Sequence, residues 1–501
     1  MKRPVAVSLA RWLVAGTLFA LTACRTPDPS PPPAVQDPST FLGLATTVVF
    51  ELPDELDRAE LFARLASAYL EIGDETSAGA VADRARRSAT AAGDGEESLR
   101  ARLALVPTYS IIASSTAVGI LESVLSVLEQ RADDVLRASL IPLVIDNALA
   151  SGEPARFALR EAVDLSYIIL DPAQRARTLI DVATLYQQSG IGLSVTALIQ
   201  QAIPAVRSVP SRYAQAALLG ELAVLADTAG DTALASRLVD IAERSLQSAG
   251  GGASADERAR LIHAARTFGA LGDRAAVELI AGLLPQGTER LLVELELASL
   301  IPLEGPRAER LTELSDQLTA IDSATDRARG LIALAEAALA DGATDLSLAS
   351  AATVQRLVAG SEDLQADESL VERLIALRVA QNEIEAVTEL MNAAETPYIR
   401  GLMAVYAADA LIAAERLTLA EDFLVVGLLA GDETTFLADS LRQLLAERLA
   451  RAGSIRLAIR TVERMDDPLL RARAVVSIAV VAEPAGMTTP LHRADLASVL
   501  R

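Results

Sequence analysis

The stretch DRAELFARLASAYLEIGDETSAGAVADRARRSA, residues 57–89, decides the fold. Its first half carries apolar residues at the i, i+3, i+4, i+7 spacing of one helix face, namely Phe62, Leu65, Ala66 and Tyr69. The pair Gly73-Asp74 then interrupts the pattern, because glycine readily adopts the left-handed conformation that ends a helix. Small residues share one face after this break, namely Ala78, Ala82 and Ala85. The stretch therefore predicts two helices packed closely on each other.

This two-helix unit recurs along the chain. A glycine separates the two helices in the clearest copies, at Gly73, Gly190, Gly230, Gly272, Gly342 and Gly453. An Arg-Ala pair marks the start of many first helices, with its arginine at Arg58, Arg100, Arg137, Arg175, Arg258, Arg327 and Arg471. The period is roughly 37 residues and gives about twelve units, and periods of this size indicate a solenoid.

The starts of the first helices carry capping chemistry. An aspartate stands just before or at several starts, at Asp57, Asp171, Asp326 and Asp467. Aspartate at the N-cap accepts hydrogen bonds from first-turn amides that otherwise lack a partner. Pro172 and Pro468 suit the first helical position, where a missing N–H costs nothing. We expect these aspartates to be N-caps.

The repeats over residues 45–485 resemble the tetratricopeptide (TPR) family, and HEAT-like repeats are the alternative. The resemblance implies an all-α solenoid, a right-handed superhelix whose concave face binds peptides or protein segments. We expect one elongated domain over residues 41–501. Residues 41–50 should form an atypical N-terminal cap, and a last helix beginning near Thr489-Pro490 should cover the open end of the stack.

The first residues indicate an export signal. Lys2, Arg3 and Arg11 precede an apolar run that is too short to span a bilayer comfortably. The run ends in Leu21-Thr22-Ala23-Cys24, which resembles the lipobox of bacterial lipoproteins. The resemblance implies that residues 1–23 are a signal peptide and that Cys24 is acylated. Several acyl chains on one residue make a stable membrane anchor.

Residues 24–40 then form the lipidated cysteine and a proline-rich linker. Arg25 follows the cysteine, where an aspartate would resemble lipoproteins retained at the inner membrane. We therefore expect the protein on the periplasmic side of the outer membrane, with surface display as the alternative. Cys24 is the only cysteine, so the chain has no internal disulfide.

The 501-residue chain is strongly acidic, with a formal net charge of −22. This charge disfavours nucleic acid and anionic membrane surfaces as partners, since both attract basic proteins. Lys2 is the only lysine and lies in the expected signal peptide, which excludes a catalytic or phosphate-loop lysine from the processed chain.

The sequence shows no enzymatic motif. Its two histidines, His263 and His492, have no metal-ligand spacing, and no nucleophile or cofactor motif is present. His263 lies between two packing positions, which favours a structural role for it. We expect no cofactor, no metal and no catalysis, although the many carboxylates leave a glycan hydrolase or lyase as an alternative.

The pattern favours a protein-binding scaffold, assembly factor or regulator of the cell envelope. Contacts to the partner should lie off the packing stripe, and the candidates are Arg64, Arg177, Arg260 and Arg329. A purely architectural spacer is a further alternative.

Overall fold

The computed structural model describes residues 40–152, 155–190, 195–249, 252–301, 306–432 and 438–499. These residues form helices and no strand, and the helices pack in sequence-adjacent pairs. The predicted all-α solenoid is confirmed. The predicted signal peptide, Cys24 and Arg25 lie outside the described residues.

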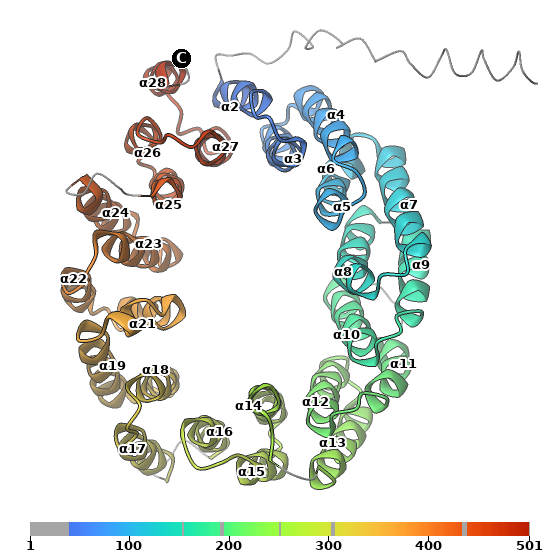
Figure 1. Ribbon diagram of the computed structural model, residues 1–501, viewed down its shortest axis with the longest axis vertical. Helices are drawn as coiled ribbons and strands as arrows, with labels where there is room; N and C mark the ends of the chain where they lie inside the picture. Colours follow the sequence, from blue (N-terminus) through green and yellow to red (C-terminus); the bar gives the residue numbers. More distant parts are fainter. Residues whose placement is uncertain are drawn as a thin grey trace, which may run out of the picture.

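The helices form two layers around a central opening (Figure 1). Twelve first helices, among the described residues, form the inner layer: α3 (Glu55–Glu71), α5 (Glu96–Leu103), α8 (Asp134–Ser151), α10 (Pro172–Ser189), α12 (Arg212–Thr228), α14 (Ala255–Ala270), α16 (Thr288–Ser299), α18 (Ala324–Ala340), α21 (Glu368–Ala380), α23 (Pro397–Ala413), α25 (Asp439–Arg451) and α27 (Pro468–Ala482). Each contacts the next one in this order, and α27 contacts α3.

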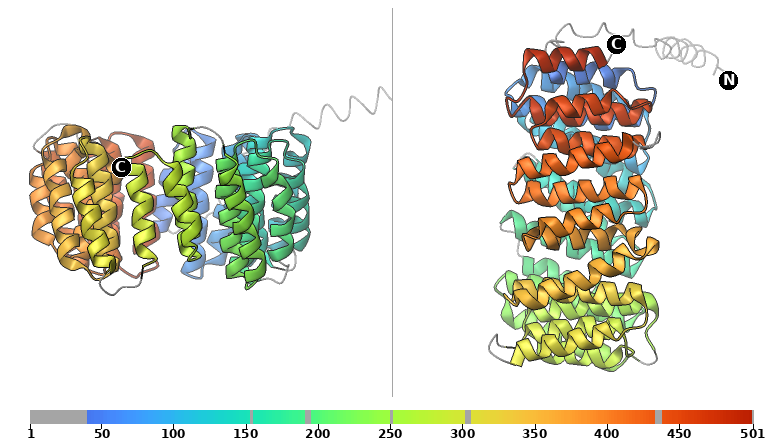
Figure 2. Two further views of the ribbon diagram at one scale, coloured as in Figure 1. Left: turned by 90° about the horizontal axis from the view of Figure 1, so that it is seen from below. Right: turned by 90° about the vertical axis from the view of Figure 1, so that its left-hand side faces the viewer.

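The second helices form the outer layer: α4 (Glu75–Ala91), α7 (Ser114–Gln130), α9 (Arg156–Tyr167), α11 (Val195–Arg207), α13 (Thr232–Gln247), α15 (Arg274–Leu283), α17 (Pro306–Thr319), α19 (Thr344–Ala359), α22 (Ile384–Asn392), α24 (Leu417–Asp432) and α26 (Ile455–Val462). Two short connecting helices, α6 (Val106–Ile112) and α20 (Glu362–Gln365), interrupt the regular order. The helix axes run roughly parallel to the axis of the ring, so the ring is about as tall as one helix is long (Figure 2).

The array closes into a ring, whereas we expected an elongated stack with an open end. The first helix, α2 (Phe41–Phe50), packs between α27 and α3, just as α11 packs between α10 and α12. It therefore takes the place of a second helix for α27. The last helix, α28 (Pro490–Val499), contacts α26 and α2 and caps no free end. We call the contacts of α27 with α2 and α3 the seam.

One apolar core runs through the whole ring and crosses the seam. It includes Phe41 and Leu42 of α2 as well as Leu496 of α28, and all three side chains are fully buried. The packing positions of the first unit, Phe62 and Leu65 among them, are also buried as predicted. A unit that cannot bury its apolar face alone is thus covered on both sides everywhere in the ring.

The turns within the units follow the predicted glycines. All six take a left-handed conformation, with φ of 78° at Gly73. The residue after Gly73 returns a hydrogen bond across the turn, from Asp74 N to Tyr69 O at 2.9 Å. Asn382 and Glu415 adopt the same conformation, with φ of 61° and 58°, in two units that lack the glycine.

The N-caps were predicted correctly in two of four units. Asp171 and Asp467 cap α10 and α27. The caps of α3 and α18 are instead Asp54 and Ser323, three residues before the predicted Asp57 and Asp326. The two mispredicted aspartates lie in the first turn, where the helix dipole still favours a negative charge.

Three arginines of the Arg-Ala pairs, and Gln215 of a Gln-Ala pair, tie their units to the preceding ones. Four equivalent side chains donate to a backbone carbonyl six residues earlier, just beyond the preceding second helix: Arg58 to Leu52 at 2.9 Å, Arg175 to Ile169 at 3.4 Å, Gln215 to Val209 at 2.6 Å and Arg327 to Ile321 at 3.1 Å. Carbonyls at a helix end lack partners within the helix, so these bonds satisfy them. The sequence signature is therefore a link between units.

Candidate binding surface around the central opening

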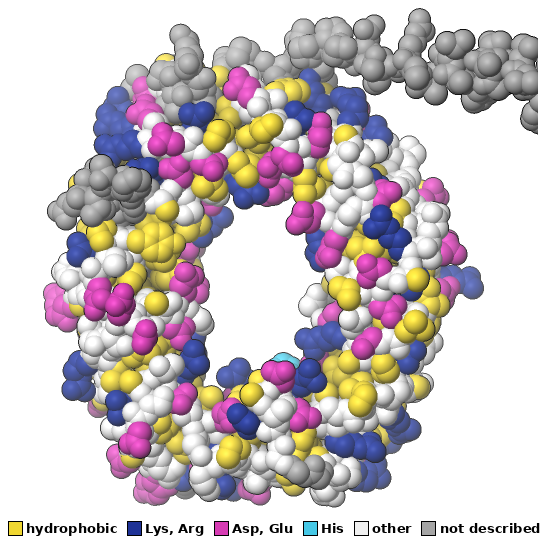
Figure 3. Space-filling view, in the orientation of Figure 1, with side chains coloured by type: hydrophobic (Ala, Val, Ile, Leu, Met, Phe, Trp, Pro, Cys, Tyr) yellow, Lys and Arg dark blue, Asp and Glu magenta, His cyan; other side chains and the backbone are white. Residues whose placement is uncertain are grey.

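The exposed faces of the first helices line the central opening, and arginine and acidic side chains surround its edge (Figure 3). The opposite faces of these helices are covered by the outer layer. The lining of the opening therefore belongs to residues off the packing stripe, where a partner would make its contacts.

Three neighbouring helices, α10, α12 and α14, form one hollow of about 560 Å³, which we call the α10–α14 hollow. Its lining consists of Ala173, Arg177, Ala214, Ala217, Leu218, Glu221, Asp256, Ala259, Arg260 and His263. Alanines make up much of its floor, and charged side chains stand at its edge. A shallow apolar floor with a polar edge suits a protein segment.

A polar cluster joins the three helices of this hollow. The Arg177 guanidinium donates to both oxygens of Glu221, at 2.6 Å each. His263 Nε2 lies 3.1 Å from Glu221 Oε1. The glutamate side chain is 16% exposed, whereas the other two are about half exposed. His263 thus faces solvent and a carboxylate, although its place in the sequence favours a packing role.

A carboxylate on α10 adds to this cluster. Burial raises the pKa of Asp181, and the nearby Glu221 raises it further, whereas Arg177 lowers it. Arg177 Nε lies 3.8 Å from Asp181 Oδ1. The hollow therefore holds closely spaced charges of both signs.

A second hollow, of about 620 Å³, lies at the seam, and we call it the seam hollow. Its lining comes from α3, α5 and α27 and consists of Leu56, Asp57, Glu60, Ala63, Arg64, Ser67, Glu97, Arg100, Ala101, Ala104 and Arg473. The same mixture of alanine floor and charged edge recurs here, although the chain is interrupted between α27 and α3.

Polar bridges cross the seam on this surface. Arg473 on α27 lies 3.2 Å from Glu60 and 3.5 Å from Asp57 on α3. In the other direction, Arg64 Nη2 donates to Ser477 Oγ at 2.9 Å. At the start of α2, the Phe41 N–H donates to Glu483 Oε2 at 2.6 Å. These contacts align the first and last units.

The seam also concentrates negative charge. Burial raises the pKa of Asp57, and the carboxylates of Asp54, Glu60 and Asp467 raise it further, while Arg473 lowers it. Ionised Asp57 is therefore less favourable in the folded protein than in the unfolded chain.

The predicted contact residues lie on this inner layer but do not form one site. Arg177 and Arg260 share the α10–α14 hollow, Arg64 lies in the seam hollow, and Arg329 on α18 bridges to Asp367 at 2.8 Å. Burial opposes ionisation of Asp367, but its bonds from Arg329 and the Leu370 N–H outweigh burial and lower its pKa. Three of the four arginines thus also link neighbouring units.

Sequence reasoning missed the acidic partners of these arginines and the role of Arg473. Arg473 occupies the position two residues after the Arg-Ala arginine, as Arg177, Arg260 and Arg329 do. That shared position was the available signal. Glu221 could not be found in the same way, because the units with a turn glycine have no other glutamate at the corresponding position, nine residues before that glycine.

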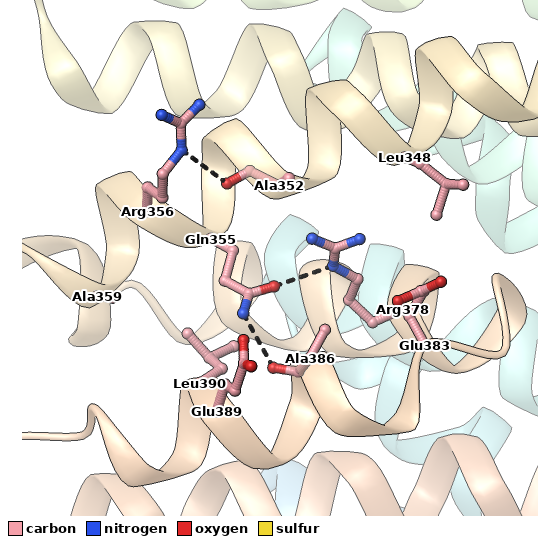
Figure 4. A pocket seen from close by; sticks show the side chains of 10 residues that line it. All are labelled: Leu348, Ala352, Gln355, Arg356, Ala359, Arg378, Glu383, Ala386, Glu389 and Leu390. Carbon is pink, nitrogen blue, oxygen red and sulfur yellow. Dashed lines mark hydrogen bonds between the residues drawn. The ribbon is translucent and has the colours of Figure 1, made fainter.

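A further hollow of about 580 Å³ lies on the outer side, between α19, α21 and α22 (Figure 4). Arg378 on α21 is 5% exposed there and donates to Gln355 at 3.1 Å and to Gln381 at 3.2 Å. Gln355 in turn donates to the Ala386 carbonyl at 3.1 Å (Figure 4). Burial lowers the pKa of Arg378. Arg378 thus joins α21 to α19, and Gln355 joins α19 to α22, at a unit without a turn glycine.

Two features are absent from the part of the chain that the structure describes. No group of three or more His, Cys, Asp or Glu side chains there could hold a metal ion. None of its helices is both long and apolar enough to cross a membrane.

No known protein family and no curated protein matches this chain. Among solved structures, Ton1535 from Thermococcus onnurineus NA1 is similar at 13% identity and a TM-score of 0.29, covering 69% of this chain and 99% of that one. A circular tandem repeat protein with novel repeat topology is similar at 14% identity and a TM-score of 0.16, covering 92% and 96%. Superpositions this poor assign no function.

Proposed function

We propose that this protein is a lipid-anchored ring that binds a segment of another cell-envelope protein in its central opening. It would act as a scaffold or as an assembly or regulatory factor, without a catalytic step or a cofactor. One observation carries the proposal: the inner layer presents two hollows of the same design, with alanine floors and charged edges. Concave surfaces of helical-repeat arrays are suited to binding extended segments.

The anchoring half of the proposal is supported by the lipobox resemblance at Leu21-Thr22-Ala23-Cys24. Acylated Cys24 would hold the ring at the periplasmic side of the outer membrane, through the proline-rich linker. A Cys24→Ala variant should lose its acyl label and leave the membrane fraction. A variant that kept both would contradict the anchor.

The binding half is tested by photo-crosslinking in living cells. A benzophenone amino acid replaces Arg260 in the α10–α14 hollow or, as the control, exposed Arg237 on outer helix α13. We expect discrete adducts, identified by mass spectrometry, from the inner position alone. Adducts of equal yield and identity at both positions, or none at Arg260, would contradict binding in the opening.

A matched assay addresses the hydrolase alternative. Purified protein incubated with cell-wall glycan should release no soluble fragments. Release of fragments would favour catalysis over scaffolding.

A further inference from the structure

Two tyrosines and two glutamates form a patch on neighbouring first helices, outside both hollows. Glu368 and Glu372 lie one turn apart on α21, and Tyr398 and Tyr406 lie two turns apart on α23. We call them the α21–α23 patch. Both glutamates are exposed, and Tyr398 is 42% exposed. Exposed aromatic side chains on an inner face are unusual in this chain, which has few aromatic residues.

The four side chains lie close enough to act together. Tyr406 Oη donates to Glu368 Oε2 at 3.4 Å. Burial raises the pKa of Tyr406 to about 12, and the charges of Glu368 and Glu372 add to the shift. Phenol rings and carboxylates thus occupy one surface, with the negative charge next to the rings.

The arginine that follows Glu372 in the chain is already engaged elsewhere. Arg373 makes two bonds to Glu336 of α18, at 2.9 and 2.6 Å. Among the described residues, neither Glu368 nor Glu372 has a cationic side chain within ion-pair distance. Two other inner-layer acids, by contrast, are paired across neighbouring helices, Glu221 with Arg177 and Asp409 with Arg448. The α21–α23 patch therefore carries negative charge that the ring does not neutralise.

We infer that the α21–α23 patch binds an arginine or lysine side chain of a partner segment in the opening. A cation over a phenol ring is attracted by the ring's electron density, and a nearby carboxylate adds a charge-assisted hydrogen bond. The strongly acidic chain favours a basic segment for the same reason, because complementary charge steers and selects partners. The inference rests on the proposed function and names the chemistry of its partner.

The test uses three labelled peptides and the purified full-length chain with Cys24→Ser. One peptide alternates glycine and arginine, a second replaces arginine with uncharged citrulline, and a third replaces it with glutamate. Fluorescence anisotropy should show binding of the arginine peptide that weakens between about 50 and 300 mM NaCl. The Glu368→Gln/Glu372→Gln variant should lose about tenfold or more in affinity.

Matched variants separate this site from general attraction to an acidic protein. Glu385→Gln/Glu389→Gln removes the same charge at the same spacing on outer helix α22 and should leave affinity unchanged. Tyr398→Leu should weaken binding, whereas Tyr398→Phe keeps the ring and should preserve it. Equal losses in the α21 and α22 variants, or equal binding of the citrulline or glutamate peptide, would overturn the inference.

The outcomes also distinguish this inference from the proposed function. Adducts at position 260 together with peptide binding that ignores Glu368 and Glu372 would leave the ring's role standing and remove the basic site. Absence of adducts in cells, together with peptide binding that depends on Glu368 and Glu372, would remove the proposed role of the ring and leave the site for basic side chains standing.

Discussion

The seam and the α10–α14 region build the same kind of surface but are held together differently. In the α10–α14 region the chain passes through α11 and α13, so each first helix is covalently linked to the next. At the seam, α27 and α3 are not consecutive in the chain, and they are joined by α2, by apolar packing and by the bridges of Arg473, Arg64 and Glu483. From this comparison we expect ring closure to be a local equilibrium, whereas continuity elsewhere is a property of the chain. Regions with fewer constraints open at lower free energy than the whole fold.

The largest expected effect comes from a charge buried in the outer layer. Leu42 on α2 and Leu238 on α13 are both fully buried. An unpaired carboxylate there costs about 4 kcal/mol or more. Leu42→Asp should detach α2 and open the ring, raising the radius of gyration in small-angle X-ray scattering while most helicity remains.

Leu238→Asp is the matched control, because α13 is held by chain on both sides. It should lower the thermal midpoint of the array without producing an open, folded form. Cooperative loss of all helicity in the Leu42→Asp variant would show that the seam does not open separately.

The next effect concerns the links between units. Arg58→Ala removes the bond to the Leu52 carbonyl, which joins α2 to α3, and Arg327→Ala removes the equivalent bond to Ile321. Each should lower the free energy of unfolding by about 1–3 kcal/mol, since a carbonyl loses a charged donor. Hydrogen exchange should then accelerate at α2 amides in Arg58→Ala only. Unchanged α2 protection would contradict a role for this bond in closure.

A smaller effect is expected from the exposed bridges. Arg473→Ala and Arg177→Ala each remove a partly exposed ion pair, which contributes about 0.2–1 kcal/mol. The seam variant should show the larger loss, because Asp57 then loses the attraction of Arg473 and keeps the repulsion of neighbouring carboxylates. Thermal melts at low salt measure the difference, and a larger loss in Arg177→Ala would reverse this ranking.

The smallest effect is a response to acid with opposite sign in the two regions. The pKa of Asp57 is raised above 3.8, so its protonation favours the folded protein, which gains stability as pH falls through the raised value. The pKa of Glu257 is lowered from 4.5 by the Ser254 amide and the Ser211 hydroxyl. The stability that ionised Glu257 contributes is present above pH 4.5 and is lost as pH falls through the lowered pKa.

Two neutral variants isolate these groups. Asp57→Asn should raise the thermal midpoint at pH 7, and the gain should vanish well below pH 3.8. Glu257→Gln should lower the midpoint at pH 7, and the loss should shrink in acid. Parallel pH profiles for the two differences would contradict the assignment.

The repeating pattern was enough to predict the units, because packing stripes such as Phe62 and Leu65 and turn glycines such as Gly73 are local features. The N-cap at Asp54 was missed, since several polar residues precede α3 and only the backbone path selects one. The seam was also missed. Ring closure depends on the angle between successive units, and that angle is set by side-chain packing. No residue pattern in α2 indicates that α27 is its neighbour.

The candidate site was less predictable than the fold. The inner-layer position of Arg177, Arg260 and Arg329 follows from helical spacing. Their acidic partners lie one unit away, and the helical spacing of residues within one unit does not give the distance to the next unit. The Arg-Ala pair was recognised as a marker of helix starts, but its bond to a carbonyl six residues earlier requires the path of the loop.

The contact between α2 and α28 has a consequence for how the chain could be ordered. A circularly permuted protein, with α28 joined to α2 and new ends placed in the turn at Gly342, would keep every helix beside its present neighbours. The break would then separate α18 from α19, and the α27–α3 boundary would become as continuous as any other. The weakest boundary of the ring is therefore expected to move with the position of the break between helices.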